Sequence, residues 1–258
     1  MKKFLVFTLF SIIFSVQSSY AEIVKYVYDG DTFVTTDNKK VRLLNINTSE
    51  TAKRNKPSEP YAVEAKNFLQ NLVINKEVIL VFDKEKKDKY KRYLAYVYLK
   101  DGTFVNSKML SEGLAHLYTF PKNVEKFEEL HLAETLARKQ KKGIWSHKRW
   151  KMQDANSNKP VEKFRFGKYQ TFKGTVKDVA TVGNKIFLNF GTNWRTDFSV
   201  EINKKNLKYF KQEGINPATY YKNKKLIIRG ILVPVNGALI KATHPQQLEI
   251  IHDRTTLK

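Results

Sequence analysis

The spacing of apolar residues switches between the strand period of two and the helix period of about 3.6, in the same order in both halves of the chain. In the first half, a helix is predicted from Ser58, with one apolar face made by Ala62, Ala65, Phe68, Leu69 and Leu72. Strand patterns precede and follow this helix at 22–28, 32–36, 40–46, 77–83 and 92–99. Three strands, a helix and two strands is the order of an OB-type barrel.

Two more helices are predicted after these strands, at 107–115 and 124–142. Asn123 is placed to cap the second helix and Gly143 to end it, since these residue types favour helix starts and stops. We therefore expect residues 22–146 to form a β-rich α+β domain, a five-stranded OB-type barrel with three helices.

The second half repeats the order of the first. A helix is predicted at 207–212, and strand patterns surround it at 169–179, 185–190, 196–202, 225–233, 239–243 and 247–251. This predicts a second β-rich, OB-like domain at 161–258. The stretch 147–160 has no apolar periodicity and ends in Asn-Ser-Asn-Lys-Pro, so a linker is expected there.

The chain has no cysteine, so no disulfide or thiolate ligand can stabilise it, and each domain must rely on a packed core. Residues 1–21 have the pattern of a secretory signal peptide, with Lys2, Lys3, an apolar run and small residues that suit cleavage after Ala21. The alternative, a membrane anchor, would need about 20 apolar residues. A secreted or periplasmic protein is expected, with no membrane span in the mature chain.

The chain is strongly basic, with a formal net charge of +22. Residues 22–146 carry a net charge of +6, and residues 159–258 carry +12. Such an excess favours a polyanion such as DNA or RNA as partner. A generally lysine-rich proteome would explain it equally well, and the charge points to no particular protein partner.

Four short stretches of the first half carry side chains suited to phosphodiester chemistry: YDGDTF at 28–33, VRLLNINTSET at 41–51, DKYKR at 88–92 and KKGIWS at 141–146. Cleaving a phosphodiester requires stabilisation of the phosphate charge and a positioned water. Arg42 and Arg92 can each bind a phosphate bidentately. Asp31 offers hard oxygen ligands that suit calcium, and Glu50 can orient or deprotonate a water.

In the order and spacing of these stretches, and in EPYAVEAKNFL, LAYVYLKDGTFVN and EGLAHLY, residues 22–146 resemble the staphylococcal nuclease (thermonuclease) family. The resemblance implies an OB barrel with three helices and calcium-dependent cleavage of DNA and RNA. It also implies residue roles. Arg42 and Arg92 would bind the phosphate, Glu50 would act on the water, Asp31 and the main-chain oxygen of Thr48 would bind calcium, and Lys89, Tyr90 and Tyr118 would meet a terminal phosphate and the sugar or base.

The chain departs from the family in one turn, where the common D-T-P-E is Asn47-Thr48-Ser49-Glu50. Asn47 replaces a calcium-binding aspartate and keeps an amide oxygen, but one negative charge is lost. Calcium binding weaker by roughly one to two decades is expected. Ser49 replaces a stiffening proline, and Lys91 stands where the family often has glycine. Since Arg42, Arg92 and Glu50 remain, a working site with weaker metal binding is predicted.

Each of these residues also has a purely structural explanation. Asp29, Gly30 and Asp31 could form a hairpin turn, and Arg42 could make a cross-strand ion pair. Glu50 could cap a helix, and the tyrosines could be packing residues. The joint occurrence of the four stretches favours the functional explanation, less strongly for the tyrosines. The histidines show no metal-ligand spacing; they are His116, His131, His147, His244 and His252.

The second domain gives less specific signals. The stretch KFRFGKYQTFKG at 163–174 alternates basic and aromatic residues. It could form a stacking platform for single-stranded nucleic acid, or simply a strand with one buried face. Trp194-Arg195 is similarly open to both explanations.

The main functional prediction is a secreted, calcium-dependent nuclease that hydrolyses DNA or RNA with little sequence preference. The alternative is a nuclease-fold protein that binds nucleic acid with weakened or lost catalysis, suggested by Asn47 and the basic second domain. A third hypothesis, an envelope structural or adhesion protein acting on acidic polymers, rests on composition alone.

Overall fold

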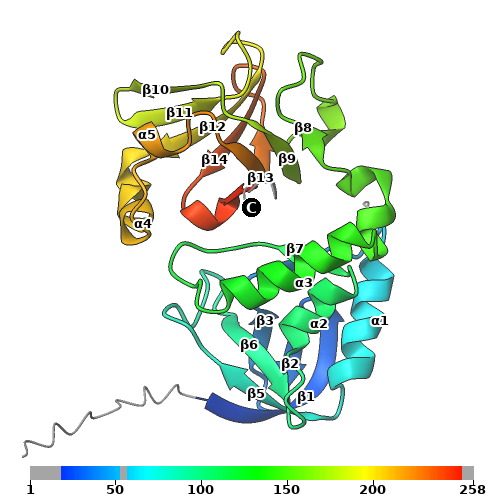
Figure 1. Cartoon of the computed structure of the whole chain (residues 1–258). Helices are drawn as coiled ribbons and strands as arrows, with labels where there is room; N and C mark the ends of the chain where they lie inside the picture. Colours follow the sequence, from blue (N-terminus) through cyan, green and yellow to red (C-terminus); the bar gives the residue numbers. More distant parts are fainter. Residues whose placement is uncertain (1–18, 53–56, 252–258) are drawn as a thin grey trace, which may run out of the picture.

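The computed structural model describes residues 19–52 and 57–251, which form two β-rich domains (Figure 1). The strands of the first domain are β1 (Ser19–Asp29), β2 (Thr32–Thr35), β3 (Lys40–Leu43), β4 (Ile46–Thr48), β5 (Glu77–Val81), β6 (Tyr93–Leu99) and β7 (Ala115–Leu117). A closed barrel forms in the order β1-β2-β3-β6-β5. This order, with β3 and β6 parallel, confirms the predicted OB-type barrel.

The long strand β1 closes the barrel because it pairs with two neighbours. Residues 19–23 lie antiparallel to β5, and residues 24–29 lie antiparallel to β2. Register shifts between Val24 and Tyr26 and between Val27 and Asp29 accompany the change of partner. Such irregularities bend a strand, and the bend lets β1 pair with β5 at its start and with β2 at its Asp29 end.

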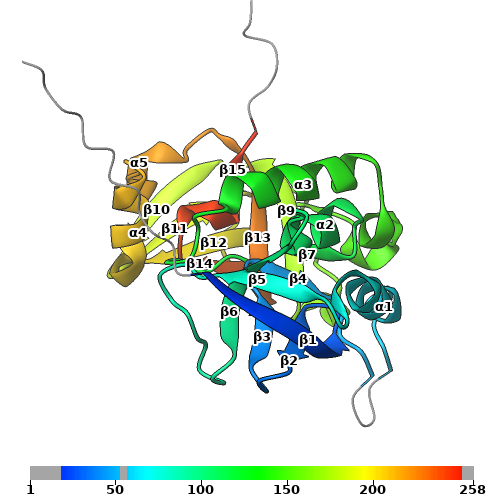
Figure 2. The ribbon, with the colours of Figure 1, turned by 90° about the horizontal axis from the view of Figure 1, so that it is seen from below.

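Three helices pack on the first domain: α1 (Ala62–Val73), α2 (Val105–Ser111) and α3 (Phe127–Lys139). The helix α1 lies beside β1, while α2 and α3 pack against each other at one end of the barrel (Figures 1 and 2). The predicted apolar face of α1 is confirmed, since Ala62, Ala65 and Leu69 are buried and Phe68 and Leu72 pack against the core.

The second domain is a curled sheet with two short helices, α4 (Leu207–Gln212) and α5 (Pro217–Tyr220). Its strands are β8 (Gln153–Asp154), β9 (Tyr169–Thr175), β10 (Asp178–Val182), β11 (Lys185–Asn189), β12 (Phe198–Asn203), β13 (Lys225–Val233), β14 (Ala238–Ala242) and β15 (Leu248–Ile250). They follow the order β10-β11-β12-β14-β13-β9-β8, with β15 on β13.

Both domains have the same strand order. Only two residues separate β9 from β10, so together they form one bent segment that borders both β11 and β13, as β1 borders both β2 and β5. The parallel pair β12 and β14 corresponds to β3 and β6, and α4 again follows the third strand. The second domain therefore has the OB-like strand order predicted for it.

Some local predictions were wrong. The helix predicted from Ser58 begins at Ala62, and the strand predicted at 169–179 is divided into β9 and β10. The predicted strand 40–46 is two strands, because Asn45 adopts a left-handed conformation (φ 62°) that redirects the chain after β3. The predicted helix 107–115 ends at Ser111, since Gly113 (φ 66°) begins a new turn and β7 follows. Asn123 does not cap α3. Its side chain binds the main chain of Glu85 instead, and α3 begins at Phe127.

The segment between the domains is folded. It contains the short 3-10 helix η2 (Lys148–Trp150), and it is flanked by two others, η1 (Gly143–Ser146) and η3 (Lys163–Arg165). Within the predicted linker 147–160, β8 pairs with β9, and the Asn156 amide binds the main chain of Thr175 and Phe190. Part of this stretch thus belongs to the second sheet.

The predicted signal peptide, residues 1–21, lies mostly outside the described residues. Its last three residues, 19–21, begin β1 and pair with Ile79–Val81 of β5. Among the helices that the structure describes, none combines the length and the apolar character that crossing a membrane requires.

A buried ionic network joins the two domains. Arg229 of β13 is 1% exposed, and its Nη2 lies 3.2 Å from Glu134 of α3 and 2.8 Å from Glu249 of β15. Glu249 also contacts His131 and Arg138 of α3. Burial would raise the pKa of Glu249, but the hydrogen bond from His131 and the charges of Arg229 and Arg138 lower it to about 2. Glu249 is therefore ionised at neutral pH.

Replacing Arg229 should destabilise the protein strongly. In Arg229→Leu, the buried Glu134 loses its main cationic partner, and removing one member of a buried pair costs about 3 to 5 kcal/mol. Urea unfolding at neutral pH should show a loss in this range. The exposed pair Lys222–Asp178 provides the control, because Lys222→Leu should cost less than about 1 kcal/mol. Equal losses for the two variants would contradict the stabilising role of the network.

Candidate active site

The turn between β1 and β2 places two carboxylates at the mouth of the barrel. Asp29 ends β1, and Asp31, which is 6% exposed, immediately precedes β2. The main chain and hydroxyl of Thr48 both donate hydrogen bonds to Asp31 Oδ2, over 3.1 and 3.3 Å. Thr32 donates to Oδ1 over 2.9 Å. The predicted hairpin turn and the predicted ligand position are therefore the same structural feature.

Arg42 lies at the centre of the site. It stands on β3 opposite Thr32, and it is 6% exposed. Its Nη1 forms an ion pair with Asp31. Its Nη2 donates to the side-chain oxygen of Asn47 over 2.8 Å and to the main-chain oxygen of Ile46 over 3.1 Å. One guanidinium thus holds the start of β2 against β4, and the predicted cross-strand ion pair is present.

Asn47 and Thr48 lie on β4, which pairs with β7. Asn47 stands opposite His116, and its Nδ2 lies 3.5 Å from His116 Nε2. The same Nδ2 donates to the main-chain oxygen of Thr48 over 3.0 Å. If His116 Nδ1 carries the proton, it donates to Leu117 O over 3.0 Å, and Nε2 is left as an acceptor for Asn47. In that tautomer, the Asn47 amide can donate a hydrogen to the neutral His116 ring.

Burial and charge shift the pKa values in this site in different directions. Burial and the nearby charge of Asp31 raise the pKa of Asp29 to about 6. Burial acts against the ionised form of Asp31, but the charge and hydrogen bonds of Arg42 outweigh it and keep its pKa below the usual value. Burial lowers the pKa of His116 to about 4, so this side chain is neutral at pH 7.

The other predicted catalytic residues lie at more open positions. Glu50 is exposed, two residues beyond the end of β4, and its main chain is bonded in both directions to Glu59. Arg92 is partly exposed and precedes β6. Asp88 accepts hydrogen bonds from Arg92 Nε and from its main-chain nitrogen, and it pairs with Nη2 at 2.7 Å. Asp88 thereby fixes the direction of the Arg92 side chain.

The predicted substrate-binding residues fall into two groups. Lys89 and Tyr90 lie in the exposed loop before Arg92, with Lys89 Nζ 5.0 Å and the Arg92 guanidinium 5.6 Å from the Tyr90 ring centre. Lys91 adopts a left-handed conformation (φ 64°), which explains why glycine would suit this position. Tyr118 instead follows β7 and contacts the second domain, with its ring 5.6 Å from Tyr169.

The oxygen atoms around Arg42 match calcium in chemical type. Asp31 offers carboxylate oxygens, Asn47 an amide oxygen and Thr48 a main-chain oxygen, which are the ligand types calcium accepts. Asp31 and Asn47 reach the same guanidinium, so their oxygens lie close together. In the parts of the chain that the structure describes, no three side chains of the types His, Cys, Asp and Glu cluster around a possible metal position.

Comparison with known proteins identifies the family of the first domain. The family described as staphylococcal nuclease homologue matches residues 40–147. The thermonuclease of Staphylococcus intermedius is 40% identical over 126 residues, which cover 48% of this chain and 74% of that protein. The chain belongs to the staphylococcal nuclease family. The family match includes Arg42, Asn47, Glu50 and Arg92, and it ends before the second domain.

Other relatives in the staphylococcal nuclease family have similar identity. The thermonuclease of Staphylococcus hyicus is 40% identical over 124 residues, which cover 47% of this chain and 73% of that protein. The endonuclease YncB of Bacillus subtilis is 40% identical over 123 residues, which cover 46% of this chain and 58% of that protein.

Sequence reasoning missed His116, which lies beside Asn47, and the two aromatic residues that pack against His116. His116 packs between Trp150, with ring centres 4.9 Å apart, and Tyr169, with ring centres 4.2 Å apart. The sequence around His116 shows no metal-ligand spacing and so gives no functional signal. Trp150 lay in the predicted linker, and Tyr169 in the predicted strand of the second domain. No pattern in the sequence links these three positions, because the packing of η2 and of β9 of the second domain against β7 creates the contacts.

Gly30 should tolerate no side chain. A Cβ atom there would lie 2.7 Å from Ala65 Cβ and 2.8 Å from Thr48 Oγ1, both in well-packed surroundings. Gly30→Ala should therefore push the turn away from β4 and lower the free energy of unfolding by about 1 to 3 kcal/mol. Urea unfolding measures this loss, and an unchanged stability would show that the turn adjusts freely.

Proposed function

We propose that this chain is a nuclease that hydrolyses phosphodiester bonds of DNA or RNA with little sequence preference, with calcium as its cofactor. The observation that carries the proposal is the convergence of Asp31, from the stretch 28–33, with Arg42 and Asn47, from the stretch 41–51, in a chain that belongs to the staphylococcal nuclease family. The relatives named thermonuclease and endonuclease support the same activity.

Calcium would be held by Asp31, Asn47 and the main-chain oxygen of Thr48. When bound, calcium would supply positive charge beside the phosphate and so stabilise the charge that develops during attack. The single carboxylate among these ligands predicts weaker binding than a site with two, since affinity depends on ligand charge. Asp29, two residues away, adds negative charge to the region once it is ionised.

Arg42 and Arg92 would bind the phosphate. Arg42 has protein oxygens as partners for both Nη atoms, so it must exchange at least one of them for a phosphate oxygen. The proposed use of Asp31 as a calcium ligand favours this exchange, because cation and guanidinium compete for one carboxylate. Arg92 keeps its contact with Asp88 through Nε and Nη2, and Nη1 can then face the substrate.

Glu50 would orient the attacking water and accept its proton. Its exposed position at the end of the β4 turn suits a group that must reach water and substrate. The turn itself is held in place by Thr48, whose main chain and hydroxyl bind Asp31. A secreted or periplasmic location, based on the predicted signal peptide 1–21, is part of the same proposal.

The second candidate function is nucleic-acid binding without cleavage. It is favoured by one observation: Arg42 is buried and its guanidinium is bound to Asp31 and Asn47, so protein groups already balance its charge. In this case the basic second domain would supply the affinity. The two functions differ in turnover, which a cleavage assay measures directly.

Purified protein should degrade single-stranded DNA in millimolar calcium, and a chelator should stop the reaction. Glu50→Gln should lower kcat by at least about a hundredfold, since a general base typically contributes a factor of 10² to 10⁴. The matched control is Glu64→Gln on the exposed face of α1, which should keep full activity. Salt-sensitive binding of DNA by the natural chain with no cleavage at high calcium would favour the second candidate.

Asn47→Asp should lower the calcium concentration needed for half-maximal activity by roughly tenfold or more. The maximal rate should change less, because Arg42, Arg92 and Glu50 are unchanged. The surface variant Asn67→Asp adds the same charge on α1 and should leave the calcium dependence as it was. If Asn47→Asp also leaves it unchanged, Asn47 is not a ligand. If Asn47→Asp creates activity from none, the natural chain is a binding protein.

A further inference from the structure

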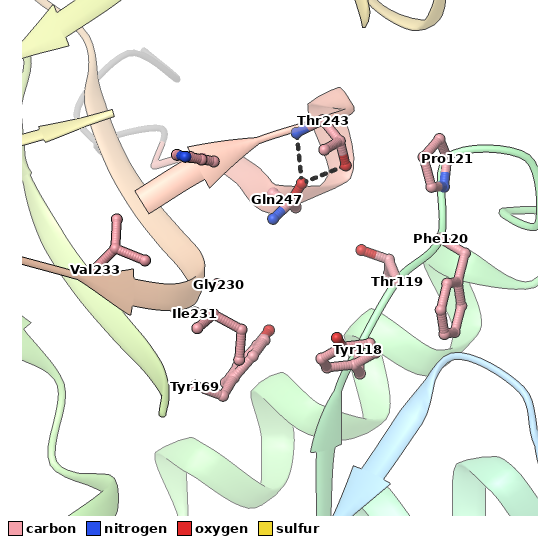
Figure 3. A pocket seen from close by; sticks show the side chains of 11 residues that line it. Tyr118, Thr119, Phe120, Pro121, Tyr169, Gly230, Ile231, Val233, Thr243 and Gln247 are labelled. Carbon is pink, nitrogen blue, oxygen red and sulfur yellow. Dashed lines mark hydrogen bonds between the residues drawn. The ribbon is translucent and has the colours of Figure 1, made fainter. Parts of the chain in front are cut away.

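A cleft of about 290 Å³ lies between the two domains. One wall is the segment after β7, made by Tyr118, Thr119, Phe120 and Pro121. The other wall belongs to the second domain, where Tyr169 and Ile231 face this segment (Figure 3). Lys241, Thr243 and Gln247 also line the cleft. The volume is close to the lower end of the range for small-molecule sites, about 300 to 1,000 Å³.

The cleft is continuous with the candidate active site through β7. His116 and Tyr118 are two residues apart on an extended segment, so their side chains leave it on the same face. His116 contacts Asn47, and the main-chain nitrogen of Tyr118 donates to Asn45 O over 2.9 Å. The ring of Tyr169 covers both His116 and Tyr118. The segment that forms one wall of the cleft is therefore in direct contact with the strand that carries Asn47.

The lining of the cleft suits a nucleotide. Tyr118 offers an aromatic ring for stacking, and it lies 5.4 Å from the ring of Phe120. Lys241 is exposed on β14 and supplies a positive charge for a phosphate. Thr243 and Gln247 hold each other by hydrogen bonds of 2.8 and 3.0 Å, so their polar groups have fixed directions (Figure 3).

The cleft also has a rigid base. The Tyr169 hydroxyl donates to Leu117 O over 2.6 Å, and His244 Nε2 lies 2.7 Å from Thr119 Oγ1. His244 is 1% exposed, and burial lowers its pKa to about 4, so it is neutral here at pH 7. These contacts fix the distance between the walls, so the opening exists before any ligand binds.

We propose that the second domain completes a nucleotide-binding subsite in this cleft, which holds an unpaired nucleotide of the substrate strand beside the bond to be cleaved. The inference rests on the proposed nuclease function. It assigns to the second domain a direct role in substrate binding, with Ile231 and Lys241 as its contributions. The base must come from single-stranded nucleic acid, because the bases of a duplex stack on one another and leave no ring face for Tyr118.

Cysteine protection tests the subsite, since the natural chain has no cysteine and a single introduced thiol reports one position. Ile231→Cys places a thiol in the cleft, where the natural side chain is 41% exposed. The control Val182→Cys lies on β10, where the side chain is 64% exposed. Both are prepared in full-length protein carrying Glu50→Gln, so that an oligothymidylate of eight nucleotides is not degraded.

Saturating oligothymidylate should slow alkylation of the Ile231→Cys thiol by about tenfold or more and leave the Val182→Cys thiol within about twofold. Lys241→Glu should raise the Kd for the same oligonucleotide by about fivefold or more, while Lys225→Glu at the far end of β13 should raise it less than about twofold. Equal protection of both thiols, or of neither, would overturn the subsite, as would equal effects of the two charge reversals.

Failure of the proposed function would give a different result. If the natural chain cleaves no DNA or RNA but oligothymidylate still protects the Ile231→Cys thiol selectively, the result supports the subsite and contradicts the proposed nuclease function. If the natural chain cleaves DNA and both thiols react at unchanged rates, the result supports the nuclease function and contradicts the subsite.

Discussion

The buried charge of Arg42 is the constraint on which the candidate site depends. A guanidinium at this depth is stable only when anions and carbonyl oxygens surround it. Asp31 and Asn47 provide these groups, together with the main-chain oxygen of Ile46. Because they come from different strands, satisfying one cation fixes the relative positions of β2, β3 and β4. The groups proposed for metal and phosphate binding are therefore pre-arranged by the folding of the barrel itself.

A second buried network controls how the two domains meet. Glu134 of α3 is 2% exposed, and one carboxylate oxygen accepts from the main-chain nitrogen of Leu117 over 2.8 Å while the other meets Arg229. The strand β7 thus carries Leu117, which is tied to the domain interface, and His116, which touches Asn47. The interface and the candidate site share the short strand β7. A displacement of the second domain would therefore shift His116 relative to Asn47.

This arrangement changes how the Asn47 substitution is understood. From the sequence, the neutral amide looked like the loss of a carboxylate. In the structure, its oxygen accepts from Arg42 and its nitrogen faces Thr48 O and His116, so both ends of the amide have partners. A carboxylate at position 47 would lose the amide hydrogens that face Thr48 O and the neutral His116. Asn47 is therefore part of a local hydrogen-bond network. Its neighbour His116 stacks on Tyr169, so this network is in contact with the second domain.

The sequence by itself determined the strand order of both domains and the stretches that supply the candidate site. Alternating and helical periods are local properties of the sequence. Each motif, around Asp31, around Arg42 and Glu50, and around Arg92, is likewise a short continuous stretch of the chain. The left-handed turn at Asn45 and the short strand β7 were not predictable, because a residue's conformation there is set by tertiary contacts, such as those of Asn45 with Tyr96 and Asn123.

Only the tertiary structure decided which of the remaining residues meet. The basic and aromatic stretch 163–174 illustrates this: Phe172 is buried against Phe198, Arg165 is buried beside Gln170, and of its aromatic residues Phe164 is the most exposed. The contact of Tyr169 with His116 joins residues 53 positions apart, across a domain boundary. Such contacts depend on how two separately folded sheets pack, and that packing leaves no periodic signal in a single chain.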